Sequence, residues 1–385
     1  MSGTNTSRAP LATLFSYGFR VFFLLAMLFA PLAIIVWMTV IAGDLVLTGP
    51  FSPVDWHVHE ILFGYTSAVM AGFLFTAIPN WTGRKPVQGA TLVVLALIWI
   101  SGRVLVAGVG GFGTAVVAVA DNAFMIAVAL LALREIIAGK NWRNLMVVGP
   151  IGVFVVANIL FHIEAATQGA ADSGKRLGFA AVVFLIMLIG GRIVPAFTGN
   201  WLSKSGPGPL PTPFNRYDGV CILAAAVGLL SWSVWPDHGL TRSLLALAAA
   251  LHFVRMLRWQ GHHTLRSALL LMLHVSYGFI PVGLMALAAG NNIAGFHLLG
   301  IGAIAGMTLA VMIRASLGHT GQQLAAGPVL STAFCSLILA AIVRAVLPDT
   351  PAGTLTGLWL AAAFWVLAFT TVLVRIGPLY FRAKH

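Results

Sequence analysis

The sequence predicts an all-α integral membrane protein, a polytopic helical bundle of about twelve transmembrane helices. Of its 385 residues, 59% are hydrophobic and only 8% are charged, whereas a soluble protein carries roughly 25% charged residues. The mean hydropathy is +0.95. The hydrophobic residues are gathered into runs of about 20, the length that an α-helix needs to cross a bilayer.

Twelve such runs follow one another along the chain. They cover residues 20–42, 57–80, 89–109, 114–138, 144–166, 177–200, 217–236, 240–258, 266–289, 293–315, 328–348 and 353–377. The loops between them are too short for a separate soluble domain. We therefore expect residues 1–385 to form a single integral membrane domain.

The basic residues predict how the helices are oriented. Lys and Arg outnumber Asp and Glu by 22 to 10, but they are scattered singly, which argues against a nucleic-acid partner and for membrane lipid. Every second loop is basic, as the positive-inside rule predicts for loops that face the cytoplasm. These loops contain Arg84, Lys85, Arg134, Lys140, Arg143, Lys204, Arg216, Arg255, Arg258, Arg266 and Arg314. Both termini are then cytoplasmic.

This orientation places several histidines at one depth on the outer side. His57 and His59 begin the second run, His162 ends the fifth and His297 begins the tenth. Ionisable side chains in membrane segments are costly and mark candidate functional sites. The two cysteines, Cys221 and Cys335, lie in separate apolar runs and predict no disulfide.

An internal repeat connects two of these histidines. His59 precedes Thr82-Gly83 by 23 residues, and His297 precedes Thr320-Gly321 by the same distance. The sixth run ends similarly at Thr198-Gly199. We predict three pseudo-repeats of four helices, at about 1–140, 141–260 and 261–385. Against this, glycine is favoured at any helix C-terminus.

If the repeat holds, His59 and His297 are symmetry-related and can clamp a metal ion or a haem iron between two helices. Imidazole is a common axial ligand for haem and also suits copper. In the alternative interpretation both are interfacial histidines that face lipid headgroups. The presence of His57 and His162 at the same depth favours ligation, with these two as further metal ligands.

Other polar residues allow two interpretations each. Arg103 and Asp121 flank a tight turn and predict a buried ion pair, or Arg103 holds a haem propionate. Asn158 and His162 form either a hydrogen-bonded pair or part of a copper site. On the inner side, His274 is the best candidate for cofactor binding, and the alternative is a hydrogen-bonded core histidine.

Three motifs resemble the NnrS family. They are His57–Gly64 (HVHEILFG) with Thr76–Gly83 (TAIPNWTG), Gly190–Pro195 (GGRIVP), and Arg314–Gly321 (RASLGHTG). The resemblance implies a bacterial inner-membrane protein that contains haem and copper and is linked to nitric oxide and nitrosative stress in denitrifying bacteria. It implies a context more firmly than a reaction.

A more distant likeness is to the catalytic subunit of haem–copper oxidases, in which histidines on helices 2 and 10 hold the low-spin haem. The present chain lacks histidines in its sixth and seventh runs, so that family's copper-ligand pattern is missing there. Only the positions of His59 and His297 match.

Three functions remain in competition. The first is a redox or gas-binding protein, with haem on His59 and His297, copper near His57 or His162, and nitric oxide or a related small molecule as its partner. The second is a transporter, which the repeat and the prolines within helices favour. The third is a non-catalytic haem-bearing sensor or assembly factor. The sequence names no electron donor and leaves open whether the chain is an enzyme.

Overall fold

The computed structural model describes residues 10–204, 206, 208–347 and 351–382, and these residues form helices and loops without a strand. Within them, eleven helices are long and apolar enough to cross a membrane, and Ala90–Val106 is a shorter apolar helix. Together they coincide with the twelve predicted runs, which confirms the all-α polytopic fold. The two chain ends, predicted to be cytoplasmic, lie outside the described residues.

The described helices belong to two compact units. The first unit comprises residues 1–148, 312–324 and 369–385, and the second comprises 149–311 and 325–368. This division into two units does not test the three predicted pseudo-repeats, which stay a prediction.

The first unit contains the N-terminal helices. They are α1 (Pro10–Leu14), α2 (Gly18–Ala42), α3 (Pro53–His59), the π-helical η1 (Glu60–Tyr65), α4 (Thr66–Thr82), α5 (Ala90–Val106), α6 (Thr114–Ala138) and η2 (Trp142–Asn144). Helix α7 (Leu145–Gln168) begins here and lies mostly in the second unit, while η6 (Gly377–Phe381) returns to the first.

The second unit continues with α8 (Asp172–Leu185), the π-helical η3 (Ile186–Gly190), α9 (Gly191–Leu202), α10 (Arg216–Val234), α11 (Gly239–Leu257), η4 (Gly261–Thr264), α12 (Ala268–Ala288), α13 (Asn292–His297), the π-helical η5 (Leu298–Ala305) and α15 (Gly327–Val346). Helices α14 (Gly306–His319) and α16 (Pro351–Ile376) each run from the second unit into the first.

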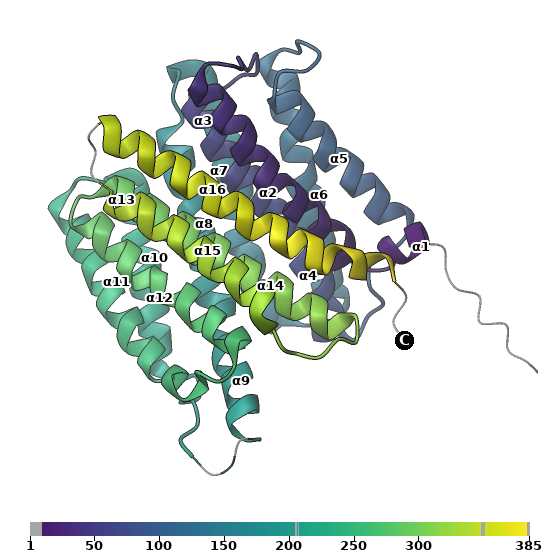
Figure 1. Cartoon of the computed structure of the whole chain (residues 1–385), viewed down its shortest axis with the longest axis vertical. Coiled ribbons are helices and arrows are strands. Elements are labelled where there is room, and N and C mark those ends of the chain that lie inside the picture. Colours follow the sequence, from purple (N-terminus) through teal and green to yellow (C-terminus); the bar gives the residue numbers. More distant parts are fainter. Residues whose placement is uncertain (1–9, 205, 207, 348–350, 383–385) are drawn as a thin grey trace, which may run out of the picture. The chain divides into compact units, whose positions relative to one another are not determined.

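Small residues allow the helices to approach closely. In the first unit α2 packs on α4, where a Cβ at Gly72 would lie 2.6 Å from the ring of Phe23. In the second unit α10, α11 and α12 lie side by side (Figure 1). Gly302 and Gly306 lie against Phe279 and Ser276 of α12. The small-residue face beyond His297 is therefore used for helix packing.

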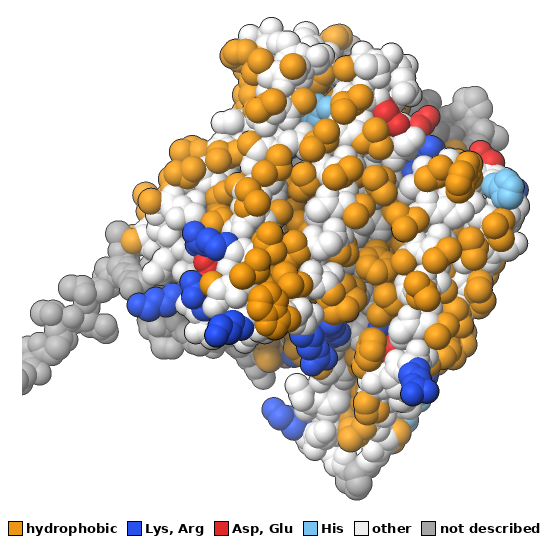
Figure 2. Space-filling view, turned by 180° about the vertical axis from the view of Figure 1, so that it is seen from behind, with side chains coloured by type: hydrophobic (Ala, Val, Ile, Leu, Met, Phe, Trp, Pro, Cys, Tyr) orange, Lys and Arg blue, Asp and Glu red, His pale blue; other side chains and the backbone are white. Residues whose placement is uncertain are grey.

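Hydrophobic side chains are also spread over the surface, as the face in Figure 2 shows, and charged ones are few. Val119, Leu223 and Val374 are 73%, 66% and 70% exposed. Exposed apolar residues in such number are expected where a helix faces lipid. The protein is thus a multi-pass membrane protein by the length, composition and surface of its helices.

The three helices that carry Thr82-Gly83, Thr198-Gly199 and Thr320-Gly321 near their C-terminal ends share a feature that the sequence did not predict: each contains a π-helical segment, η1, η3 or η5. Their C-terminal ends differ from the prediction. Gly83 and Gly321 follow helix ends in the left-handed conformation, with φ of 68° and 75°, which glycine adopts without steric cost. Helix α9, however, continues through Gly199 to Leu202, so the expected end at Thr198-Gly199 was wrong.

Candidate metal centre

His59 stands where α3 passes into a π-helical segment. The side chain of Ser52 caps α3 by accepting a hydrogen bond from the backbone N–H of Asp55, and Pro53 occupies the first turn; both features favour a helix start. His59 is the last residue of α3, and η1 begins at Glu60. Such π-helical segments occur frequently at functional sites.

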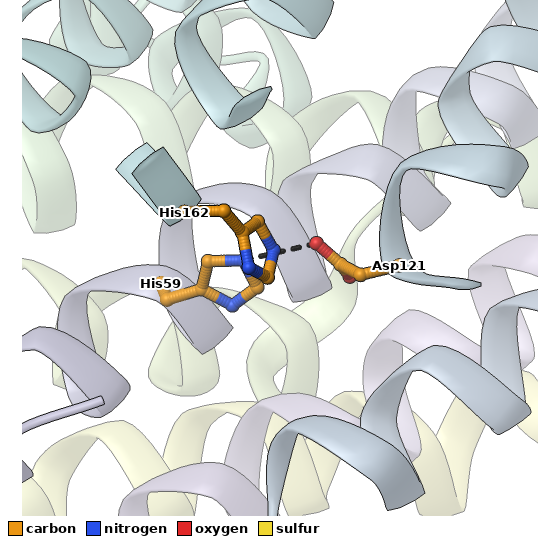
Figure 3. A group of neighbouring side chains, drawn as sticks. All are labelled: His59, Asp121 and His162. Carbon is orange, nitrogen blue, oxygen red and sulfur yellow. Dashed lines mark hydrogen bonds and ion pairs between the residues drawn. The ribbon is translucent and has the colours of Figure 1, made fainter. Parts of the chain in front are cut away.

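Both ring nitrogens of His59 face carboxylates. Nδ1 lies 2.9 Å from Oε1 of Glu60, and Nε2 lies 3.1 Å from Oδ2 of Asp121 (Figure 3). The side chain of His59 is fully buried, and the rings of Phe51 and Phe63 lie 4.6 and 5.4 Å from its ring. The imidazole is thus held in one orientation and is shielded from solvent.

Arg103 completes this cluster. Its guanidinium is ion-paired with Glu60 and with Asp121, so the predicted Arg103–Asp121 pair is confirmed. Helices α5 and α6 pack against each other, and Gly102 brings Asp121 close because a Cβ there would lie 3.3 Å from the Asp121 Cα. Trp99, one turn before Arg103, donates its indole N–H to the Gly64 carbonyl of η1 over 3.0 Å.

Glu60 lies within the motif His57–Gly64 and is not among the predicted metal ligands. The structure buries Glu60 almost completely, between Arg103 and His59. The sequence feature that could have indicated a role for Glu60 is its position directly after His59.

The charges of these four residues favour a cation. Glu60 and Asp121 carry two negative charges and Arg103 one positive charge, which leaves one negative charge among them when His59 is neutral. Excess charge is costly at a buried position. A proton on His59 or a metal ion beside it compensates this charge.

The donor set fits a metal ion. His59 and Asp121 each offer a ligand atom, close enough together to share one ion. Glu60 accepts the hydrogen bond from Nδ1–H, which leaves Nε2 as the ligating nitrogen, the arrangement by which a carboxylate usually orients a metal-bound histidine. Imidazole and carboxylate together suit Cu(II), Fe and Zn.

The model of the NnrS protein family matches residues 13–384, nearly the whole chain. The chain belongs to the NnrS family. No curated protein matches the sequence.

Four further histidines are predicted ligands of this NnrS-family protein. His57, in α3, stacks on Trp37 with ring centroids 4.7 Å apart. His162 is buried in the part of α7 that belongs to the second unit, as is Asn158. Their roles as metal ligands stay predictions.

His297 and His274 both lie in the second unit. His297 ends α13, with its Nδ1 2.7 Å from the carbonyl oxygen of Ile293. His274 is buried in α12, and its Nε2 lies 2.8 Å from the hydroxyl of Thr198. Because that hydroxyl donates its own hydrogen to the Val194 carbonyl, it accepts one from His274. The role of His274 in cofactor binding stays a prediction.

The second unit also contains a buried network that the sequence did not predict. Arg255, counted above among the basic loop residues, is instead fully buried in α11 and paired with Asp218 over 2.8 Å. Its Nη1 donates to the Met187 carbonyl of η3 over 2.9 Å. In both units a buried arginine therefore lies against a π-helical segment.

Proposed function

We propose that this NnrS-family protein holds a metal ion at His59 and Asp121 and uses it to bind or convert nitric oxide in the nitrosative stress response of a bacterium. The observation that supports this most is the imidazole of His59 held between two buried carboxylates. The family implies copper and haem, and of these two copper suits a nitrogen and an oxygen donor from side chains.

Each residue of the cluster has a distinct part. His59 Nε2 and an Asp121 oxygen hold the ion, and Glu60 fixes the ring through Nδ1. Arg103 keeps both carboxylates in place. The rings of Phe51 and Phe63 exclude water from the imidazole. When bound, copper supplies the redox chemistry and a ligand position, and nitric oxide, being small and weakly polar, reaches the centre through the bilayer.

The haem predicted between His59 and His297 fits this site less well. A haem iron requires an open approach to the ligating nitrogen, whereas His59 Nε2 faces Asp121 at 3.1 Å and the side chain is fully buried. We therefore assign His59 to the ion. A haem shared with His297, and further ligands from His57 and His162, stay predictions.

The location of the protein in the bacterial inner membrane is part of the same proposal. An apolar surface and at least eleven long apolar helices require a membrane, and the family implies the bacterial inner membrane. The basic residues of alternate loops support a cytoplasmic position for both termini.

Metal content of the purified protein tests this proposal. Protein from copper- and haem-replete cells is expected to contain copper, and His59→Ala and Asp121→Ala are expected to lose it. His263→Ala, which removes an exposed histidine of the second unit, serves as the matched control and is expected to keep it. Addition of nitric oxide to the wild type is expected to change its electron paramagnetic resonance spectrum.

Two results would overturn the proposal. One is a wild-type protein free of metal, which would move the transporter to first place. The other is full copper content in the His59→Ala variant, which would show that the ion is bound elsewhere. Replacing His162 and His57 in turn then measures whether either contributes to affinity.

A further inference from the structure

A narrow hollow lies between three helices of the second unit. Its volume is about 240 Å³, and residues of α7, α8 and α10 line it. Half of these residues are small: Gly149 and Pro150 of α7, Ala180 and Ala181 of α8, and Ala226 of α10. A Cβ at Gly149 would meet no atom within 4 Å. The hollow therefore arises because these side chains are too short to fill the space between the helices.

The hollow is apolar and opens at the surface of the helices. Its larger lining residues are Val153, Leu177, Phe184, Leu229 and Leu230. Of these, Val153 and Leu230 are 37% and 54% exposed, whereas Ala180 and Ala181 are buried at its floor. Apolar cavities stay free of water. In a membrane-spanning helix bundle, the molecules available to fill such a space are the hydrocarbon chains of lipids.

The dimensions of the hollow suit one such chain. On α8 it extends from Leu177 to Phe184, which is roughly 10 Å at 1.5 Å per residue. One leaflet contributes about half of the ~30 Å hydrocarbon core of a bilayer, so the hollow covers much of a leaflet. Its volume is smaller than the roughly 300–1,000 Å³ of pockets that bind drug-sized molecules. A single extended chain therefore fits better than a bulky ring system.

A cation lies at one end of the hollow. Arg176 directly precedes Leu177 on α8, and its Nε donates to the carbonyl oxygen of Ser233 over 3.4 Å. Ser233 lies three residues beyond Leu230 on α10, so the guanidinium bridges the two helices just past the last lining residues. Its two Nη groups have no hydrogen-bond partner among the described residues, and the side chain is half-buried. These donors are accessible to a lipid headgroup.

The neighbouring charges leave Arg176 able to bind an anion. Lys175 is paired with Asp172 over 2.8 Å, and the charge of Arg176 also acts on Asp172. The buried carboxylate of Glu164 accepts from the backbone N–H of Gly174 over 2.8 Å. Two cations thus lie beside one exposed carboxylate. A guanidinium binds phosphate especially well, because two of its N–H groups can donate in parallel.

We propose that the hollow between α7, α8 and α10 holds one acyl chain of an anionic phospholipid whose phosphate is bound by Arg176. The apolar lining accepts the chain and the guanidinium accepts the headgroup, so two parts of one molecule are recognised. The bound lipid fills the space beside Gly149 and joins three helices of the second unit. This site is independent of the metal ion at His59, so either proposal can fail without the other.

Native mass spectrometry of the purified protein, with added phosphatidylglycerol or phosphatidylcholine, tests this proposal. The wild type is expected to bind one phosphatidylglycerol roughly tenfold more tightly than phosphatidylcholine, the effect of one charge-assisted hydrogen bond. Arg176→Gln should remove this preference. Arg242→Gln, which removes a cation of the same unit that is paired with Asp237 over 3.6 Å, is the matched control and should keep it.

A second pair of variants tests the place of the chain. Ala226→Trp puts a large side chain into the hollow and is expected to abolish the tight lipid site. Leu223→Trp adds a tryptophan at a position of the same helix that is 66% exposed and does not line the hollow. This control should bind phosphatidylglycerol as the wild type does.

The possible outcomes separate the alternatives. Equal affinity for the two lipids, or a preference that survives Arg176→Gln, overturns the assignment of the headgroup. A tight site that survives Ala226→Trp overturns the assignment of the chain. A dimer that Ala226→Trp dissociates would show that a second copy of the protein occupies the hollow, which also contradicts the proposal. Arg176→Gln changes a half-buried residue and decides the question even where Ala226→Trp fails to fold.

Discussion

The guanidinium of Arg255 donates a hydrogen bond to the phenol oxygen of Tyr277 over 2.9 Å. The Tyr277 hydroxyl in turn lies 2.8 Å from Nδ1 of His252, whose Nε2 lies 3.1 Å from the Cys221 carbonyl oxygen. That carbonyl requires a hydrogen on Nε2, so in neutral His252 Nδ1 accepts from the phenol. The direction of each of these hydrogen bonds is thus determined. The side chains of Arg255, Tyr277 and His252 are fully buried.

Tyr277→Phe is expected to lower the free energy of unfolding by about 1–3 kcal/mol, because it leaves a buried donor on Arg255 and a buried acceptor on His252 without partners. Thermal denaturation in detergent measures this. Tyr217→Phe is the matched control: it also removes a hydroxyl that is hydrogen-bonded, here to the Leu251 carbonyl, but at a less buried position. Equal effects of the two changes would contradict our account of the network.

Arg103→Met is expected to destabilise the first unit by about 3–5 kcal/mol, since it leaves the carboxylates of Glu60 and Asp121 buried without a counter-charge. The double variant Arg103→Met with Glu60→Gln should lose less than the sum of the two single changes, because they remove interacting groups. The folded fraction after detergent extraction, by size-exclusion chromatography, is the measurement. Strict additivity would mean that Glu60 and Arg103 do not interact.

Adjacent glycines provide a third test. A Cβ at Gly191 would collide with the guanidinium of Arg255, whereas a Cβ at Gly190 would have only ordinary contacts, the nearest at 3.6 Å. We expect Gly191→Ala to cost about 1–3 kcal/mol through overpacking and Gly190→Ala to be close to neutral. Melting temperatures of the two variants decide this, and the reverse order would contradict the packing of Arg255 against α9.

Arg20 is expected to hold the C-terminal segment in the first unit. Its Nη1 donates to the carbonyl oxygens of Tyr380 and Arg382 over 2.8 and 2.9 Å. Arg20→Ala should therefore speed cleavage by trypsin after Arg375 and Arg382. Arg84→Ala, which breaks a half-exposed ion pair with Glu135, should leave this cleavage unchanged because such pairs contribute little.

The helices could be predicted because a bilayer imposes a minimum apolar length, and that length is visible in the sequence. The Arg103–Asp121 pair was predictable for a related reason, since the glycine turn between them fixes an antiparallel hairpin. The burial of Arg255 could not be predicted, because a basic residue near a helix end satisfies the positive-inside rule whether it is buried or exposed. The burial of Glu60 could not be predicted either. The direction of its side chain depends on the π-helical turn that follows His59, and no residue type marks that turn.

The three π-helical segments also change how positions on these helices are to be counted. Each segment adds residues to a turn, and one added residue rotates everything beyond it by roughly 100° about the helix axis. A helical wheel drawn from Thr82 back to His59 as an unbroken α-helix therefore assigns the histidine to the wrong face. A deletion of one residue within Glu60–Tyr65 would keep the composition and hydropathy of the helix and still turn His59 away from Asp121.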